Sequence, residues 1–140
     1  MAQNQTLIHD LTALIKQKDN YTQQKERKIK EAIDLLRVPN ASAEQRYAIN
    51  QRLFDEFKTY ISDSAVYYVK ENIRIAEELQ KTDLQNDSRL SLASLYIISG
   101  NYLDAADLLR AIDKEQLQEP QLIQYYNCYL NLYNNYAFNN

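Results

Sequence analysis

The 140-residue sequence has little of the material that makes turns, disulfides and metal sites. It contains one glycine, two prolines, one cysteine, one histidine and no tryptophan. This scarcity leaves few places for β-hairpins or for a glycine-rich phosphate-binding loop. Cys128 is the single cysteine, so it cannot form a disulfide within the chain, and cysteine usage leaves the compartment open. The absences point away from β-rich and disulfide-stapled folds.

Long apolar runs and a dominant charge of one sign are also missing. No apolar run approaches the roughly 20 residues that cross a bilayer, and the first ten residues lack the basic and then apolar order of a signal peptide. The formal net charge is −3, with Lys and Arg interspersed among Asp and Glu. We therefore expect neither a membrane span nor direct nucleic-acid binding in this segment.

The residues that could carry chemistry are isolated from one another. His9 and Cys128 lie more than a hundred residues apart. The sequence contains no C-x-x-C, no H-E-x-x-H and no Asp-rich calcium loop. Neighbouring carboxylates such as Glu77 and Glu78, and the basic run from Lys25 to Glu31, are typical of solvated helix faces. We expect no catalytic residue, no metal and no cofactor, hence no enzyme.

What the sequence does contain is apolar periodicity of three and four residues along most of its length, which predicts an all-α protein. The first segment is expected either as one long helix to about Arg37 or as two helices joined near Asp19, ended by Pro39. Ser42 and Gln45 form a capping-box pattern at the next helix start. The stretch 62–64 offers an N-cap for a helix from 65 to about 81, and the expected later helices span 87 or 88 to 99, 102–112, and 120 onwards.

A spaced set of small and bulky residues stands out in the second half of the chain. Its members are Leu92, Ala93, Tyr96, Gly100, Tyr102, Ala105 and Leu109. This set resembles the tetratricopeptide repeat, a pair of antiparallel helices that approach closely at small residues. Ala93 and Ala105 are the predicted points of close approach, and Gly100 is predicted to end the first helix with a positive φ.

A weaker copy of the motif lies 40 residues earlier. Ala65 and Val69 match Ala105 and Leu109, whereas Leu53 and Tyr60 replace the alanine and the glycine. The polar stretch "TDLQNDS" (82–88) is interpreted as a lengthened linker between the copies. We expect one helical repeat domain over 1–140, stacked as a short solenoid. Its parts are an N-terminal helical segment (1–38), a degenerate repeat (42–82), the best repeat (87–117) and the first helix of an incomplete repeat (120–140).

Three stretches carry a narrower resemblance. "DNYTQQKERKIKEAIDLL", "DSAVYYVKENIRIAEEL" and "YYNCYLNLYNNYA" are similar to the N-terminal part of Bacteroidetes tetratricopeptide proteins described as transcriptional regulators. The resemblance implies that the repeats precede a membrane segment, a coiled coil and a C-terminal domain. It also implies a bacterial sensory or scaffolding module that binds a protein partner.

The first helix of each tetratricopeptide pair lines a concave groove, and this motif position nominates the candidate partner-binding residues. They are Tyr47, Asn50, Gln51, Phe54, Lys58, Asp87, Leu90, Ser91, Ser94, Ile98 and Tyr125. Because they include no cluster of Lys and Arg, we expect a peptide or helix held by apolar and amide contacts. Two alternatives stay open: a homodimer through the polar first helix and the Tyr-rich end, and a small-molecule sensor domain.

Overall fold

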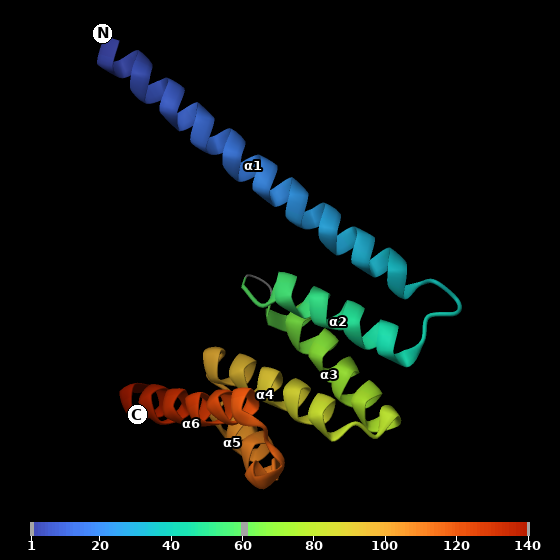
Figure 1. The fold of residues 1–140 in the computed structure, drawn as a ribbon. Helices are drawn as coiled ribbons and strands as arrows, with labels where there is room; N and C mark the ends of the chain where they lie inside the picture. Colours follow the sequence, from blue (N-terminus) through green and yellow to red (C-terminus); the bar gives the residue numbers. More distant parts are fainter. Residues whose placement is uncertain (1, 60–61, 140) are drawn as a thin grey trace. The chain divides into compact units, whose positions relative to one another are not determined.

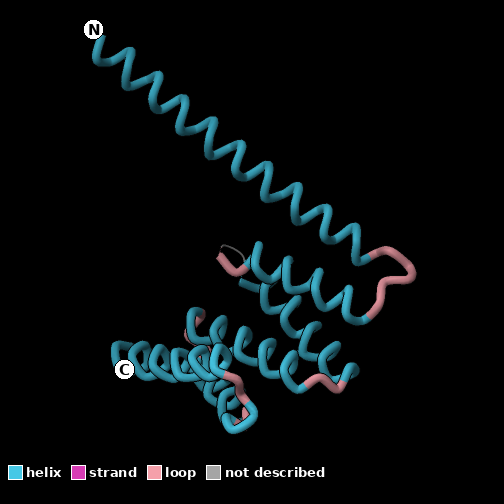
Figure 2. Tube along the Cα trace, in the orientation of Figure 1, coloured by secondary structure: helices cyan, strands magenta, loops and turns pink. Residues whose placement is uncertain are grey.

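The computed structural model describes residues 2–59 and 62–139, which form six α-helices, one short 3-10 helix and no β-strand. The chain divides into two compact units, Met1–Val38 and Pro39–Asn140. Figures 1 and 2 show helices joined by short loops throughout. The predicted all-α class and the antiparallel packing of helix pairs are confirmed.

The first unit is a single long helix. α1 runs without a break over Ala2–Leu36, which decides between the two predicted alternatives in favour of one helix. The helix ends ahead of Pro39, whose ring disfavours helical geometry at the preceding residue. Apolar side chains near its N-terminal end are exposed: Leu7, Ile8, Leu11, Leu14 and Ile15.

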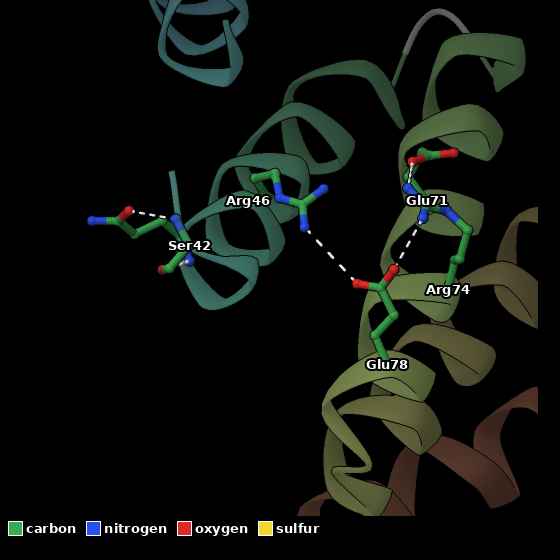
Figure 3. Close-up of polar contacts among 6 residues, drawn as sticks. Ser42, Arg46, Glu71, Arg74 and Glu78 are labelled. Atoms are coloured by element: carbon green, nitrogen blue, oxygen red, sulfur yellow. Dashed lines mark hydrogen bonds and ion pairs between the residues drawn. The ribbon is translucent and has the colours of Figure 1, made fainter. Parts of the chain in front are cut away.

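α2 (Ala43–Phe57) and α3 (Ser62–Leu79) form the first helix pair of the second unit. The predicted capping box is present: the Gln45 N–H donates to Ser42 Oγ at 3.1 Å, and the Ser42 N–H donates to Gln45 Oε1 at 2.8 Å. Figure 3 shows this cap at the start of α2. Tyr47, Ile75 and Ala76 form a buried cluster between α2 and α3.

Exposed charges also connect α2 with α3. The Glu78 carboxylate lies 3.9 Å from Arg46 on α2 and 3.3 Å from Arg74 on its own helix, and Arg74 also pairs with Glu71 at 2.7 Å (Figure 3). Because all four side chains are at least one third exposed, such pairs contribute about 0–1 kcal/mol each. The apolar contacts, not the ion pairs, hold this helix pair together.

α4 (Thr82–Ile98) and α5 (Tyr102–Ala111) form the second pair, where the sequence motif is strongest. Ala93 and Ala105 have no exposed surface, as expected for points where two helices touch. Leu109 fills the space beside them and is also fully buried. Tyr96 and Tyr102 are partly buried against the same cluster. The motif therefore describes the packing of α4 on α5.

The predicted linker over 82–88 is wrong, because α4 begins at Thr82 and only two residues separate it from α3. Asn86 and Ser88 look like caps in the sequence, but they are buried inside the helix bundle. The Ser88 hydroxyl donates to the Leu84 carbonyl oxygen at 2.7 Å, so its polarity is satisfied within the helix. The 40-residue spacing arises from longer helices.

Gly100 ends α4 with a φ of +83°, as predicted. The Asn101 N–H donates to the Tyr96 carbonyl oxygen and the Gly100 N–H to that of Ile97, the two hydrogen bonds of a Schellman motif. The turn between α3 and α4 has the same pattern, with Gln80 at a φ of +54° in the glycine position. The sequence analysis did not predict this second turn. Tyr60, which stands at the glycine position of the weaker copy, lies outside the described residues.

The last helix, α6, spans Glu119–Asn139 and follows the 3-10 helix at Lys114–Gln116. Pro120 lies in its first turn, as predicted. α6 packs against α4 and α5, and the Gln121 amide donates to the Asp83 carbonyl oxygen at 2.9 Å and to Asp87 Oδ1 at 2.7 Å. α2, α4 and α6 are thus the first helices of successive pairs.

Candidate partner-binding groove

α2, α4 and α6, each the first helix of a repeat, lie next to one another and form one surface. The Tyr47 hydroxyl on α2 donates to the Leu84 carbonyl oxygen on α4 at 3.1 Å, and α4 packs directly on α6. Burial raises the pKa of Tyr47 to about 12, so this hydroxyl remains a donor above pH 10, where an ordinary tyrosine ionises. Contacts along these helices, rather than loops, hold the surface in place.

A groove with a volume of about 520 Å³ opens on this surface. Residues of α2, the two residues that follow it and residues of α4 line the groove, and α6 contributes Gln124. The lining residues are Gln51, Phe54, Asp55, Lys58, Thr59, Ser91, Ser94, Leu95, Ile98 and Gln124. Six of these are among the residues predicted from motif position: Gln51, Phe54, Lys58, Ser91, Ser94 and Ile98.

The groove carries charge of both signs, and the charges are paired. Lys58 Nζ lies 3.3 Å from Asp55 Oδ1 and 5.7 Å from the centroid of the Phe54 ring. The Gln51 amide donates to the same Asp55 carboxylate oxygen at 3.4 Å. Lys58 is the one basic residue in the lining, so the groove offers no clamp for a peptide carboxylate.

The lining combines hydroxyl and amide groups with one strongly exposed apolar side chain. Ile98 is 80% exposed at the end of α4. The Ser94 hydroxyl donates to the Leu90 carbonyl oxygen at 3.1 Å and lies 3.3 Å from Cys128 Sγ. Burial raises the pKa of the Cys128 thiol, so this cysteine is a small packed side chain and not a thiolate nucleophile.

Five predicted residues do not line the groove. Leu90 has no exposed surface and belongs to the core between α4 and α5. Tyr47, Asn50 and Tyr125 are each less than 10% exposed. Asp87 is half-buried and accepts the hydrogen bond from Gln121. The motif positions selected helices that line this groove but did not separate side chains that face the groove from those that face a neighbouring helix.

Four lining residues are not among those candidates: Asp55, Thr59, Leu95 and Gln124. Helical spacing could have found the first two, because Asp55 lies one turn after Gln51 and Thr59 one turn after Asp55. Leu95 is mostly buried and contributes only its edge to the groove. No sequence signal distinguishes such an edge from a core leucine.

Among the described residues, neither a metal centre nor a membrane-spanning helix is found. Within residues 2–59 and 62–139, no group of three or more His, Cys, Asp or Glu side chains is arranged to hold a metal ion. In the same residues, no helix combines the length and the apolar character needed to cross a membrane.

The helix pairs pack closely at Ala93 and Ala105, and the first helices of the pairs line a groove. These features define a tetratricopeptide-repeat solenoid. Repeats of this class mediate protein interactions. The family model described as the SusR N-terminal TPR domain matches residues 15–140, which is most of the chain. The chain therefore belongs to this family. Comparison with curated proteins and with solved structures gave no match.

Proposed function

We propose that this chain is a non-catalytic module that binds a segment of a protein partner in the groove between α2, α4 and α6. The observation that carries the proposal is the composition of that groove. It combines an exposed apolar anchor, Ile98, with a row of amide and hydroxyl groups and with charges that already neutralise each other. Such a surface suits an extended or helical segment that presents apolar side chains and backbone polar groups.

The chemistry of the groove also narrows the partner. Because the Lys58 ammonium is paired with Asp55, a ligand gains little by bringing a carboxylate of its own. We expect the bound segment to be uncharged where it lies over Ser91 and Ser94. An apolar side chain of the partner would contact Ile98 and the exposed edges of Phe54 and Leu95.

The groove is tested with phage-displayed random 12-residue peptides selected on the 140-residue chain. Fluorescence polarisation then compares the affinity of selected peptides for the wild type, Ile98→Glu and Leu103→Glu. These two residues are 80% and 79% exposed, so both substitutions spare the core, but only Ile98 lines the groove. We expect Ile98→Glu to weaken binding at least about 10-fold, equal to about 1.4 kcal/mol, and Leu103→Glu to leave it unchanged.

Two outcomes would contradict the proposal. One is a selection that yields no peptide of micromolar affinity. The other is a set of peptides that bind Ile98→Glu as tightly as the wild type, because such peptides would occupy another surface. Circular dichroism of each variant establishes that it is folded.

We further propose that the module is the sensory or scaffolding N-terminal part of a bacterial transcriptional regulator. The matching family, which is the SusR N-terminal TPR domain, supports this assignment. The full reading frame tests it: a membrane helix and a DNA-binding segment after residue 140 would support the regulator, and a stop codon at that point would refute it.

A further inference from the structure

A chain of buried hydrogen bonds joins α3, α2 and α4 through Tyr47. The Asn72 amide on α3 donates to the Tyr47 backbone carbonyl oxygen at 3.0 Å, and the Tyr47 hydroxyl donates to the Leu84 carbonyl oxygen on α4 at 3.1 Å. Tyr47 is 9% exposed and Asn72 is 1% exposed. Tyr47 is therefore held on both sides, by its backbone against α3 and by its hydroxyl against α4.

Asn72 serves this chain through one of its two polar atoms. Its Oδ1 atom is buried and has no hydrogen-bond partner among the described residues. A buried acceptor without a partner lowers stability, and an apolar side chain at this position would avoid that cost. What the amide provides is the hydrogen bond from its nitrogen, which fixes the place of Tyr47 between α3 and α4.

The groove begins about one helical turn beyond this chain of hydrogen bonds. Gln51, its first lining residue on α2, follows Tyr47 by four residues, and Ser91, its first on α4, follows Leu84 by seven. Residues four or seven apart lie on the same face of a helix. The hydrogen bond between Tyr47 and Leu84 thus joins α2 to α4 on the face that carries the groove, and it closes this end.

The lining continues from this closed end to the C-terminal ends of both helices. It reaches Thr59 just after α2 and Ile98 at the end of α4, and the exposure of Ile98 opens this end to solvent. A rise of about 1.5 Å per residue gives the groove a length of about 10–12 Å. A partner segment that fills it therefore contributes about two turns of helix or about three to four extended residues.

We infer that Tyr47 is a positioning residue for partner binding: its hydroxyl ties α2 to α4 at the closed end of the groove and sets the width that a bound segment finds. The effect on binding rests on the proposed function, whereas the separation of α2 and α4 is a property of the free chain. A groove that has the correct width only part of the time binds with an affinity reduced by that fraction. Loss of the hydroxyl should therefore weaken binding, although Tyr47 lies outside the groove lining.

Tyr47→Phe removes the connection between α2 and α4 with little other change. The ring remains to fill its place in the buried cluster between α2 and α3. The Leu84 carbonyl oxygen keeps the hydrogen bond that the Ser88 hydroxyl donates at 2.7 Å, so this acceptor still has a partner. We expect the variant to fold, which circular dichroism checks.

Tyr125→Phe is the matched control. Tyr125 is also 9% exposed, but it lies on α6, where its ring packs edge-on against Tyr129 of the same helix. Both substitutions remove one hydroxyl from a buried tyrosine, and of the two only Tyr47→Phe removes a hydrogen bond between α2 and α4. A difference between the two variants thus reports the connection at the end of the groove.

Double electron–electron resonance measures the separation of α2 and α4 in the free chain. Spin labels on Arg52→Cys in α2 and Ser99→Cys at the end of α4 occupy exposed positions outside the groove lining, whereas Cys128 is 2% exposed and too buried to react. We expect one narrow distance distribution with Tyr47 present, the same distribution for Tyr125→Phe, and a broader one that reaches longer distances for Tyr47→Phe. Equal distributions in all three proteins would overturn the inference.

Fluorescence polarisation with peptides selected on the 140-residue chain measures the effect on binding. We expect Tyr47→Phe to raise the dissociation constant about 3- to 10-fold and Tyr125→Phe to change it less than about 2-fold. Alanine scanning of a selected peptide should place the sensitive positions within about eight consecutive residues, the length of two helical turns. Sensitive positions spread over the whole peptide would contradict a groove closed at Tyr47.

The outcomes separate this inference from the proposed function. Peptides that require Ile98 but bind Tyr47→Phe as tightly as the wild type would overturn the inference and leave the proposed function standing. A selection without any binding peptide would contradict the proposed function, and the distance measurement would still decide whether Tyr47 sets the separation of α2 and α4.

Discussion

Exchanging residue types between the two Schellman turns should change stability in opposite directions. Gly100 and Gln80 occupy equivalent positions, with φ of +83° and +54°, after α4 and α3. A Cβ added at Gly100 would meet no heavy atom within 4 Å, so the cost of Gly100→Ala comes from the backbone and not from a clash. A left-handed conformation costs an L-residue about 1–2 kcal/mol, and alanine recovers about 0.4–1 kcal/mol by restricting the unfolded chain.

The net expectation is that Gly100→Ala lowers the free energy of unfolding by about 1 kcal/mol and that Gln80→Gly raises it by a similar amount. Gly100→Asn should cost less than alanine, since asparagine tolerates positive φ, and Gly100→Val should cost at least about 1 kcal/mol because it is β-branched. The double variant Gly100→Ala/Gln80→Gly should lie close to the wild type, because the two turns share no hydrogen bond.

Urea denaturation followed by circular dichroism at 222 nm measures these differences as shifts of the midpoint at constant slope. The reasoning would be refuted if Gly100→Ala left the midpoint unchanged, or if Gln80→Gly lowered it. A large loss at Gly100→Ala, above about 3 kcal/mol, would also contradict it, because backbone conformation alone cannot account for such a value.

Two other substitutions probe the helix contacts. Burial raises the pKa of Tyr47 from 10.0 to about 12, so between these pH values the folded chain keeps a proton that the unfolded chain has released, and the free energy of unfolding falls as the pH rises. Between pH 9 and pH 12, Tyr47→Phe should lose up to about 2–3 kcal/mol less of its free energy of unfolding than the wild type loses. Urea titrations of both proteins at these two pH values measure the difference. An unchanged pH dependence would argue against a buried hydroxyl. Ala105→Leu should lower the free energy of unfolding by about 1–3 kcal/mol, because Ala105 has no exposed surface at the contact of α4 with α5. Its control is Ala111→Leu on the exposed side of α5, which should change this free energy by no more than about 0.5 kcal/mol. Equal melting temperatures for the two alanine variants would show that the helices do not touch at Ala105.

The groove depends on side-chain directions that differ within one helix. Ser91 and Ser94 line it, whereas Leu90, one residue before Ser91, points into the core. Successive residues on a helix are separated by about 100° of rotation about its axis. The rotation of the helix, which the sequence alone does not fix, therefore decides which residue reaches the groove. Experiments on binding should therefore begin with Ile98, because its side chain is 80% exposed and lines the groove.

Local signals in the sequence were sufficient for several elements. The Ser42 and Gln45 capping box, the stop before Pro39, Pro120 in the first turn of α6 and the positive φ of Gly100 all depend on the chemistry of a few neighbouring residues. The all-α class follows from the periodicity and the lack of turn residues. These features need no information about distant parts of the chain.

Tertiary structure decided what local chemistry left ambiguous. The sequence of 82–88 resembles a capped linker, yet packing places Leu84, Asn86 and Ser88 inside a helix, because tertiary burial outweighs weak helix propensity. Gln80 adopts a conformation typical of glycine because helix packing on both sides fixes the turn. The pairing of Lys58 with Asp55 and the opening of the groove beside Ile98 likewise depend on how α2, α4 and α6 assemble. The sequence by itself determined the all-α class, several helix ends and the small residues at which helices meet, because these depend on neighbouring residues, and only the packed structure decided that 82–88 is helical and which polar residues line the groove.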